Sequence, residues 1–350
     1  MKLKNRVFLG IFTILFALLL LELSTRIIFL EYSRPVIQYD NVLVWTYVHN
    51  LRLDTFTTNS FGFRDSNHKL EKSSKRIVFV GDSYTAGVSF PRQMIFPGII
   101  QDKFEDSEIL NFGVSAYATD QEYLVLKNHV IRYNPDIMIL VVAPNDLRES
   151  YVKRLFYIKD NQLILDKNNK AFYLSKIDQF LWNLAIKSQA VYMLQLRLGK
   201  NYGSFEYIFN EVTNGVFFKD NKGYNADAIL FLKNETYEMR ESVKLFTKLI
   251  EEINKICIKK NIKLVIVNLP IKMQFDNTMN NNNFDQKKIA NILKKITNKN
   301  KIYYLDLYPL FKESEDPTSY YISDEFHLNE NGHKFVSEEI YKFLIKNKLI

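Results

Sequence analysis

The chain has 350 residues, 47% of them hydrophobic and 25% charged, a composition typical of a globular protein of one large or two smaller domains. The formal net charge of +8 comes from lysines dispersed among acidic residues, so we expect a solvated basic surface and no nucleic-acid partner. The single cysteine, Cys257, excludes an intramolecular disulfide and a cysteine-rich metal site. Because there is also no HExxH or comparable motif, no metal and no other cofactor is expected.

The first thirty residues differ from the rest in charge and hydropathy. Three basic residues precede an uncharged apolar run at 7–21, which would span about 22 Å as a helix. The apolar stretch continues beyond Glu22 and Arg26, which lie four apart in the order that favours an ion pair. No A-x-A-like cleavage site follows the run. Residues 1–34 are therefore predicted to be a cytoplasmic stub and one uncleaved transmembrane helix, with the remaining chain outside the cytoplasm, periplasmic or on the cell surface.

Beyond this predicted anchor, strand-like and helix-like segments alternate along the chain. The most apolar of them, residues 136–142, is typical of a strand buried on both faces. The predicted strands are 77–80, 108–112, 136–142, 263–270 and 302–309. The predicted helices are 96–104, 120–132 with Asp120 as its N-cap, 237–260, 285–297 and 332–346. Alternation of this kind predicts an α/β fold with a mainly parallel sheet covered by helices on both sides.

The alternation also divides the chain into parts. Residues 35–75 are predicted to be a connecting segment that packs on the catalytic domain, which spans residues 76–350. An insertion at about 148–235 interrupts that domain and exceeds what a minimal fold of this type needs.

The insertion contains two recognisable patterns. Residues 154–168 resemble two short strands joined by a turn at 159–161, and residues 178–200 resemble one amphipathic helix. We expect the insertion to cap the site and set substrate choice; a structural excursion or a membrane-proximal packing surface is the alternative. Its aromatic side chains suit sugar stacking as well as core packing: Tyr157, Phe172 and Tyr173.

Polar or small residues follow three of the predicted strands and predict a site at one edge of the sheet. Ser83, Gly113 and Asn145 stand directly after strands, where parallel sheets bind ligands. Asp324 and His327 lie three residues apart in a loop before the last helix. A serine becomes a nucleophile when an imidazole takes its proton and a carboxylate orients that imidazole. Backbone N–H groups of Ser83 and Gly113 and the amide of Asn145 are candidate oxyanion donors.

Each of these residues also has an ordinary structural explanation. The Gly-Asp-Ser sequence ending in Ser83 can be a tight turn, and Asn145 can belong to an Asx turn or a helix N-cap. Asp324 can be a loop residue, and His327 a surface histidine. His333, six residues further on, is the main rival for the role of base.

Taken together, four sequence blocks resemble those of the SGNH (GDSL-type) hydrolase superfamily. They are Gly81-Asp82-Ser83-Tyr84-Thr85, Gly113 in Asn111-Phe112-Gly113, Asn145-Asp146, and Asp324-x-x-His327, and they cover about residues 76–335. The resemblance implies a flavodoxin-like three-layer α/β/α sandwich, with Ser83 as nucleophile, His327 as base and Asp324 as its partner. It also implies an oxyanion hole formed by Ser83, Gly113 and Asn145.

One upstream segment adds to the resemblance, and one residue of the third block departs from it. The segment NSFGFRD at 59–65 is similar to one that precedes the serine block in membrane-anchored bacterial relatives. Ala143 replaces the glycine that usually opens the third block. An α/β-hydrolase would carry Gly-x-Ser-x-Gly, and Thr85 stands in place of its second glycine.

The resemblance implies a serine esterase or O-acyltransferase. With an outward-facing domain, its expected substrates are acyl esters, chiefly acetyl esters, of a cell-envelope saccharide or lipid. Its other expected partner is the membrane, through the N-terminal helix; the sequence identifies no protein partner. The alternative is a catalytically idle envelope-assembly or glycan-binding protein that kept the fold.

Overall fold

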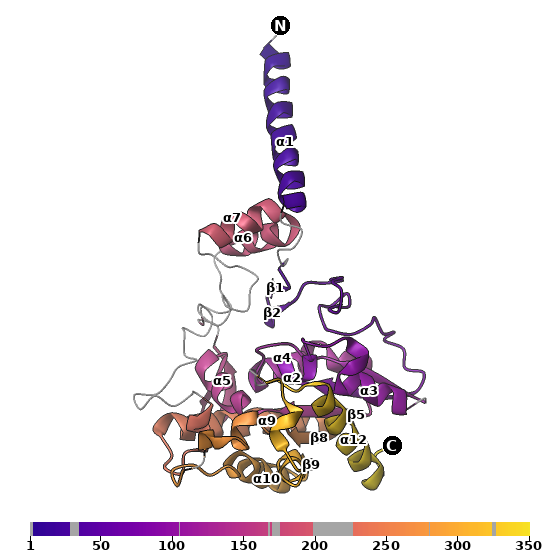
Figure 1. Ribbon diagram of the computed structural model, residues 1–350, viewed down its shortest axis with the longest axis vertical. Coiled ribbons are helices and arrows are strands. Elements are labelled where there is room, and N and C mark those ends of the chain that lie inside the picture. The colour runs from indigo at the N-terminus through magenta and orange to yellow at the C-terminus, as the bar shows by residue number, and fades with distance from the viewer. Residues whose placement is uncertain are drawn as a thin grey trace.

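The computed structural model of the chain describes residues 3–28, 35–104, 106–166, 169, 176–198, 227–279, 281–323 and 327–350. Its centre is a sheet of five parallel strands in the order β4-β3-β5-β8-β9 (Figure 1). The strands are β3 (Lys75–Val80), β4 (Ser107–Asn111), β5 (Ile137–Val142), β8 (Lys263–Asn268) and β9 (Tyr303–Asp306). Every residue of β5 is buried, as its continuous apolarity predicted.

The strand order confirms the predicted flavodoxin-like fold. Numbered along the chain, the five strands run 2-1-3-4-5, the flavodoxin-like order. The chain reverses its direction of winding between β3 and β5, and the carboxyl ends of those strands flank the crevice where such folds bind ligands. Residues after β3 and β5 are therefore placed at the switch point.

Helices form a layer on each face of the sheet, as right-handed crossovers require. On one face α3 (Phe96–Lys103) packs against α12 (Glu330–Lys346). On the other face α9 (Tyr237–Lys259) contacts α4 (Thr119–Asn128), α5 (Pro144–Lys153) and α10 (Lys288–Asn300). The remaining short helices are α2 (Ser83–Ala86), α11 (Leu307–Lys312), and the 3₁₀ turns η1 (Arg92–Met94), η2 (Val130–Tyr133), η4 (Ala228–Phe231), η5 (Lys272–Gln274), η6 (Asn277–Met279) and η7 (Pro317–Tyr320).

Two predicted elements were wrong in their boundaries. The strand predicted at 302–309 ends at Asp306, whose carboxylate accepts a hydrogen bond from Tyr308 N–H and caps α11. Pro309 is tolerated there because the first turn of a helix has N–H groups without intrahelical partners. Asp120 is not an N-cap: α4 begins at Thr119, and Asp120 is buried in its first turn.

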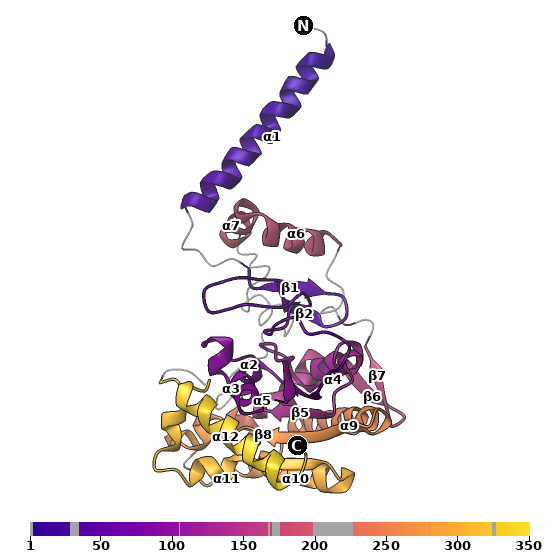
Figure 2. The same ribbon diagram turned by 90° about the vertical axis from the view of Figure 1, so that its right-hand side faces the viewer.

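The N-terminal helix α1 (Leu3–Ile28) stands away from the α/β domain (Figure 1). None of its residues is buried, and by length and composition it can cross a membrane, with a mean hydropathy of 2.5 over its most apolar window. After it, an antiparallel hairpin of β1 (Ile37–Asp40) and β2 (Val44–Tyr47) lies between α1 and the α/β domain (Figure 2). Tyr117 OH donates to Trp45 O at 2.5 Å, which ties this hairpin to the loop after β4.

The insertion contributes a second hairpin and a pair of helices. Strands β6 (Phe156–Lys159) and β7 (Gln162–Leu165) pair as predicted around Asp160 and Asn161, both with positive φ. The single helix predicted at 178–200 is wrong: it is α6 (Lys176–Lys187) and α7 (Gln189–Arg197). The break lies at Ser188, whose hydroxyl accepts from Val191 N–H and caps α7. The prediction for Phe172 and Tyr173 lies outside the described residues.

Candidate active site

Ser83 is the first residue of the four-residue helix α2, directly after β3. A side chain at Gly81 would place its Cβ 2.2 Å from Thr85 Oγ1, so only glycine allows this tight strand-to-helix turn. Asp82 caps the helix, since its carboxylate accepts from Tyr84 N–H at 2.9 Å. The turn thus leaves Ser83 partly exposed while both of its neighbours are buried.

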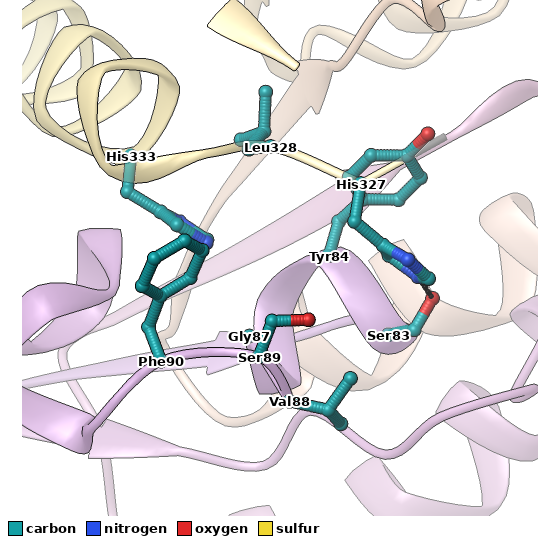
Figure 3. A pocket seen from close by; sticks show the side chains of 9 residues that line it. All are labelled: Ser83, Tyr84, Gly87, Val88, Ser89, Phe90, His327, Leu328 and His333. Carbon is teal, nitrogen blue, oxygen red and sulfur yellow. Dashed lines mark hydrogen bonds between the residues drawn. The ribbon is translucent and has the colours of Figure 1, made fainter. Parts of the chain in front are cut away.

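The structure brings His327 to Ser83 from 244 residues further along the chain: Nε2 lies 2.9 Å from Oγ (Figure 3). The His327 loop is held in place because Ile322 N–H donates to His327 O and Tyr321 pairs with Leu328. The imidazole also lies beside the ring of Tyr84, with ring centres 5.3 Å apart. Asp324 lies outside the described residues, so its predicted role stays a prediction.

His333, the sequence's alternative base, is placed elsewhere. It is buried in α12 between the rings of Phe90 and Phe96, and its Nδ1 accepts from Phe96 N–H at 3.4 Å. Burial lowers the pKa of His333 to about 3, helped by the charge of Arg64. His333 is therefore a neutral core residue, and Figure 3 shows it across the pocket from Ser83.

Gly113 lies against the carboxyl end of α2. A Cβ at this position would lie 2.5 Å from Ala86 N and 2.7 Å from Thr85 C, so glycine is required by the close approach of two backbones. Its N–H donates to Asn111 Oδ1 at 2.8 Å. The predicted oxyanion donor is thus engaged with a neighbouring side chain.

Asn145 is the second residue of α5, after β5. Its Nδ2 lies 3.3 Å from Asp82 Oδ2 and 3.3 Å from Glu149 Oε1. Asp82 therefore contacts both the nucleophile helix and the amide predicted to serve the oxyanion. No local sequence pattern indicates that Asp82 and Glu149 contact the Asn145 amide, although each is close in sequence to a predicted site residue.

A set of buried carboxyl groups lies among α2, α4 and α5. They are Asp82, Asp120, Glu122, Asp146 and Glu149, none more than 5% exposed. Burial raises the pKa of Asp82 to about 7 and that of Asp120 to about 7, and raises those of Glu122 and Asp146 well above the usual range. Lys153 contributes a buried cation, 3.2 Å from Glu149. Among the described residues, no three acidic, histidine or cysteine side chains are arranged to hold a metal ion.

Asp120→Asn is expected to stabilise the protein at alkaline pH. The unfolded carboxyl ionises near pH 4, whereas the folded one ionises near pH 7, so the wild type loses stability as pH rises between these values. The amide keeps the acceptor for Gln121 N–H and removes the buried charge. Urea unfolding of the detergent-solubilised chain should show no gain near pH 4 and a gain of up to about 4 kcal/mol above pH 7.

Asp136→Asn is the control with the opposite sign. Burial alone would raise the pKa of Asp136, but hydrogen bonds from Lys72 Nζ and Arg76 N–H outweigh it and lower the pKa. This variant should lose stability at pH 7 and not at low pH. A pH-independent effect of Asp120→Asn would contradict the assignment of a protonated buried carboxyl.

Arg64 supports the nucleophile helix from the connecting segment. Its buried guanidinium donates to Ala86 O and Gly87 O, at the carboxyl end of α2, and to Phe90 O and Thr55 O. The next residue, Asp65, accepts from Asn111 N–H at 2.9 Å, on β4. The motif at 59–65 was noticed in the sequence, but the role of these two side chains depends on contacts between distant segments.

Arg64→Lys is expected to lower the unfolding free energy by about 2–4 kcal/mol and to reduce kcat/KM. The single ammonium group of lysine cannot donate to all four carbonyl oxygens that the Arg64 guanidinium reaches. Some of these buried carbonyl groups would therefore lose their hydrogen-bond donor. Thermal unfolding and ester hydrolysis of the same preparation would measure both effects. Arg92→Lys, at a partly exposed ion pair with Asp65, should cost less than about 1 kcal/mol. Equal effects of the two variants would argue against a special role for Arg64.

A small pocket opens beside Ser83 and His327 (Figure 3). Its empty volume is about 180 Å³. It is lined by Ser83, Tyr84, Gly87, Val88, Ser89, Phe90, His327, Leu328 and His333. Tyr157, for which both core packing and sugar stacking were open, is exposed and lines a different cleft with Tyr151 and Arg154, between β6 and α9, so it is not a core residue.

Comparison with known proteins identifies the family of the chain. The profile of the family described as GDSL-like Lipase/Acylhydrolase matches residues 77–340. Similar solved structures include a lipase/acylhydrolase from Enterococcus faecalis (11% identity, TM-score 0.43, covering 77% of this chain and 95% of that one). Another is the acetyl xylan esterase AlAXEase (17% identity, TM-score 0.40, covering 76% and 98%). No curated protein matches the sequence.

Proposed function

Because this chain belongs to the GDSL-like lipase/acylhydrolase family, we propose that it is a serine esterase or O-acyltransferase acting on acyl esters of a cell-envelope saccharide or lipid. The observation that carries the proposal is the 2.9 Å contact between Ser83 Oγ and His327 Nε2. A serine hydroxyl within hydrogen-bond reach of an imidazole, at the mouth of a pocket, is the arrangement that nucleophilic acyl transfer needs.

The reaction proceeds through an acyl-enzyme on Ser83. Its Oγ attacks the ester carbonyl carbon while His327 Nε2 takes the hydroxyl proton, and a tetrahedral oxyanion forms. When this intermediate collapses, the alcohol leaves with the proton from His327. Water, or a hydroxyl of an acceptor, then attacks the acyl-enzyme carbonyl carbon while His327 takes its proton. The second tetrahedral intermediate collapses, Ser83 Oγ leaves and recovers the proton from His327, and the acyl group is released on the new oxygen. Asp324 orients the imidazole and stabilises its charged form.

The oxyanion is stabilised by Ser83 N–H, Gly113 N–H and the Asn145 amide. Ser83 N–H opens α2, where backbone donors have no partner within the helix. The other two donors are held by Asn111 Oδ1 and by Asp82 and Glu149. These acceptors keep the donors oriented in the free enzyme, and the negatively charged oxygen of the intermediate competes with them for the same protons.

The acyl group is short, chiefly acetyl. The pocket beside Ser83 is small, with apolar lining from Val88, Phe90 and Leu328, which favours a short acyl group. Phe90 and His333 close it opposite the nucleophile (Figure 3). A long acyl chain would meet the half-buried ring of Phe90 and the buried ring of His333.

The enzyme works at a membrane, anchored by α1. The helix has 26 residues, about 39 Å, and exposes its apolar side chains around its whole circumference. Three basic residues near its start support an orientation with the N-terminus in the cytoplasm and the α/β domain on the outer side. Esters of envelope glycans and lipids are the acyl esters available there.

Hydrolysis of p-nitrophenyl acetate, butyrate and octanoate by the full chain in detergent tests the activity and the acyl size together. We expect the acetate to have the highest kcat/KM and the octanoate the lowest. Mass analysis should show an acetyl group on the peptide containing Ser83, which is absent from Ser83→Ala. A released acetyl group indicates a hydrolase, and its transfer to an added saccharide indicates a transferase. Preference for the octanoate would refute the short-chain assignment and leave the nucleophile intact.

A further inference from the structure

Helices α6 and α7 expose a set of large apolar side chains that no described residue covers. Its members are Ile177 (70% exposed), Phe180 (63%), Leu194 (57%) and Leu198 (66%), here called the α6–α7 apolar face. An exposed cluster of this kind on a soluble surface marks an interaction site. The position of the two helices, across the end of α1, identifies the partner (Figures 1 and 2).

The α6 helix is fixed on its other side to the β1–β2 hairpin. Trp182 is buried, donates from Nε1 to Ile37 O at 3.0 Å, and packs beside the ring of Tyr39. At about 100° per residue, Phe180 projects about 160° and Ile177 about 140° away from Trp182 around the helix. Both therefore point away from the hairpin and from the α/β domain behind it.

The α7 helix is fixed to the end of α1. The Glu22 carboxylate accepts hydrogen bonds from Ser188 Oγ at 2.7 Å, Gln189 N–H at 3.0 Å and Ala190 N–H at 3.1 Å. It thereby satisfies the N-terminal backbone donors of α7. Arg26 pairs with Glu22 and donates to Lys187 O at 3.2 Å. The two charges that interrupt the apolar run of α1 are thus explained by this junction.

The junction sets the height of the two helices relative to the bilayer. Glu22 and Arg26 follow directly after the uncharged stretch of α1, at the depth where hydrocarbon gives way to headgroups. Exposed basic side chains accompany the apolar face: Lys176, Lys187 and Arg197. Apolar side chains flanked by cations are typical of helices that lie in the interface of a membrane with anionic lipids.

We propose that the α6–α7 apolar face inserts into the outer interface of the membrane that α1 crosses, so that the lipid surface is its partner. The proposal rests on the membrane anchoring of the proposed function. The lipid-facing surface of α1 then continues into the α6–α7 apolar face, with no layer of other described residues between them. The insertion acts as a second attachment that sets the domain's orientation, and this part of it is not a lid over the site.

Site-directed spin labelling of the full chain in nanodiscs of phosphatidylethanolamine and phosphatidylglycerol tests this proposal. Labels are placed by Phe180→Cys and Leu194→Cys in a Cys257→Ala background. Ile14→Cys on α1 and Ile258→Cys on α9 serve as the lipid and water references, being 62% and 69% exposed. Collisions with oxygen report lipid, and collisions with a nickel chelate report water. Each variant should retain ester hydrolysis, which shows that it is folded.

We expect the labels at 180 and 194 to collide with oxygen several-fold more often, relative to the chelate, than the label at 258. Labels at 180 and 194 that match the one at 258, while the label at 14 reports lipid, would overturn the proposal and leave the anchor standing. Protection of 180 and 194 from both reagents would also overturn it, because a protein surface would then cover them. A label at 14 that reports water would refute the anchor itself.

Discussion

Replacing Ser83 with alanine is expected to reduce kcat/KM for p-nitrophenyl acetate by about 10⁴-fold or more. The substitution removes the only oxygen that lies 2.9 Å from His327 Nε2 among the described residues, and with it the acyl-enzyme. Hydrolysis that remains would come from water acting in a site with oxyanion donors. The effect should appear in kcat, since the acyl pocket keeps its lining.

Ser89→Ala is the matched control for the nucleophile. Ser89 lines the same pocket, but it is exposed and takes no part in the 2.9 Å contact between Ser83 Oγ and His327 Nε2. This variant should retain near wild-type turnover and should still be acetylated at Ser83. Full activity of Ser83→Ala would remove the nucleophile from the proposal, whatever the behaviour of the control.

His327→Ala should cause a comparable loss of activity with little loss of stability. The imidazole is only partly buried, and its chemical role is to accept the Ser83 proton. His333→Asn should have the opposite profile. Its side chain is 2% exposed and packed between two aromatic rings, so the change should lower the unfolding free energy by about 1–3 kcal/mol and leave most of the turnover.

Measuring kcat and thermal unfolding on both histidine variants separates the two roles. We expect His327→Ala to lose catalysis and keep its stability, and His333→Asn to lose stability and keep most of its catalysis. If His333→Asn abolished turnover while His327→Ala kept it, the base would be misassigned. The neutral, buried state of His333 makes that outcome inconsistent with the geometry.

The buried carboxyl groups show why an active site of this kind costs stability. Asp82 caps α2 and holds the Asn145 amide, two tasks that require a carboxylate next to Ser83. Its neighbours Glu122 and Asp146 are also buried, so their negative charges oppose one another. Protonation of part of this set at neutral pH lowers the repulsion. Because the pKa values of these groups are raised in the folded state, they make the folded protein more stable in mild acid than at higher pH.

Much of the fold could be predicted from local patterns. Residues 137–142 are continuously apolar because β5 is buried on both faces, and the long amphipathic pattern at 237–260 became α9 almost residue for residue. Hydrophobic periodicity depends on neighbouring residues, so it survives without tertiary information. The errors arose where a side chain changed the backbone locally: Asp306 ended a strand early, and Ser188 divided one predicted helix into two.

The candidate site was predicted in part. The order of the strands places Ser83 and Asn145 on adjacent strand ends, as the flavodoxin-like fold implied by the family resemblance predicts. Choosing His327 over His333 required more than spacing, since both histidines precede or begin the same helix. Only the packing of α12 against α3 buries one ring and leaves the other at the serine.

By itself, the amino-acid sequence determined the α/β class, the apolar N-terminal helix and the residue types needed for acyl transfer, because these depend on composition and on neighbours along the chain. Tertiary structure alone decided which distant groups lie within hydrogen-bond distance, how Arg64 holds the end of α2, and how Glu22 joins the N-terminal helix to α7. Those contacts join segments up to 244 residues apart. No local pattern encodes such a distance, since it is set by the packing of the whole domain.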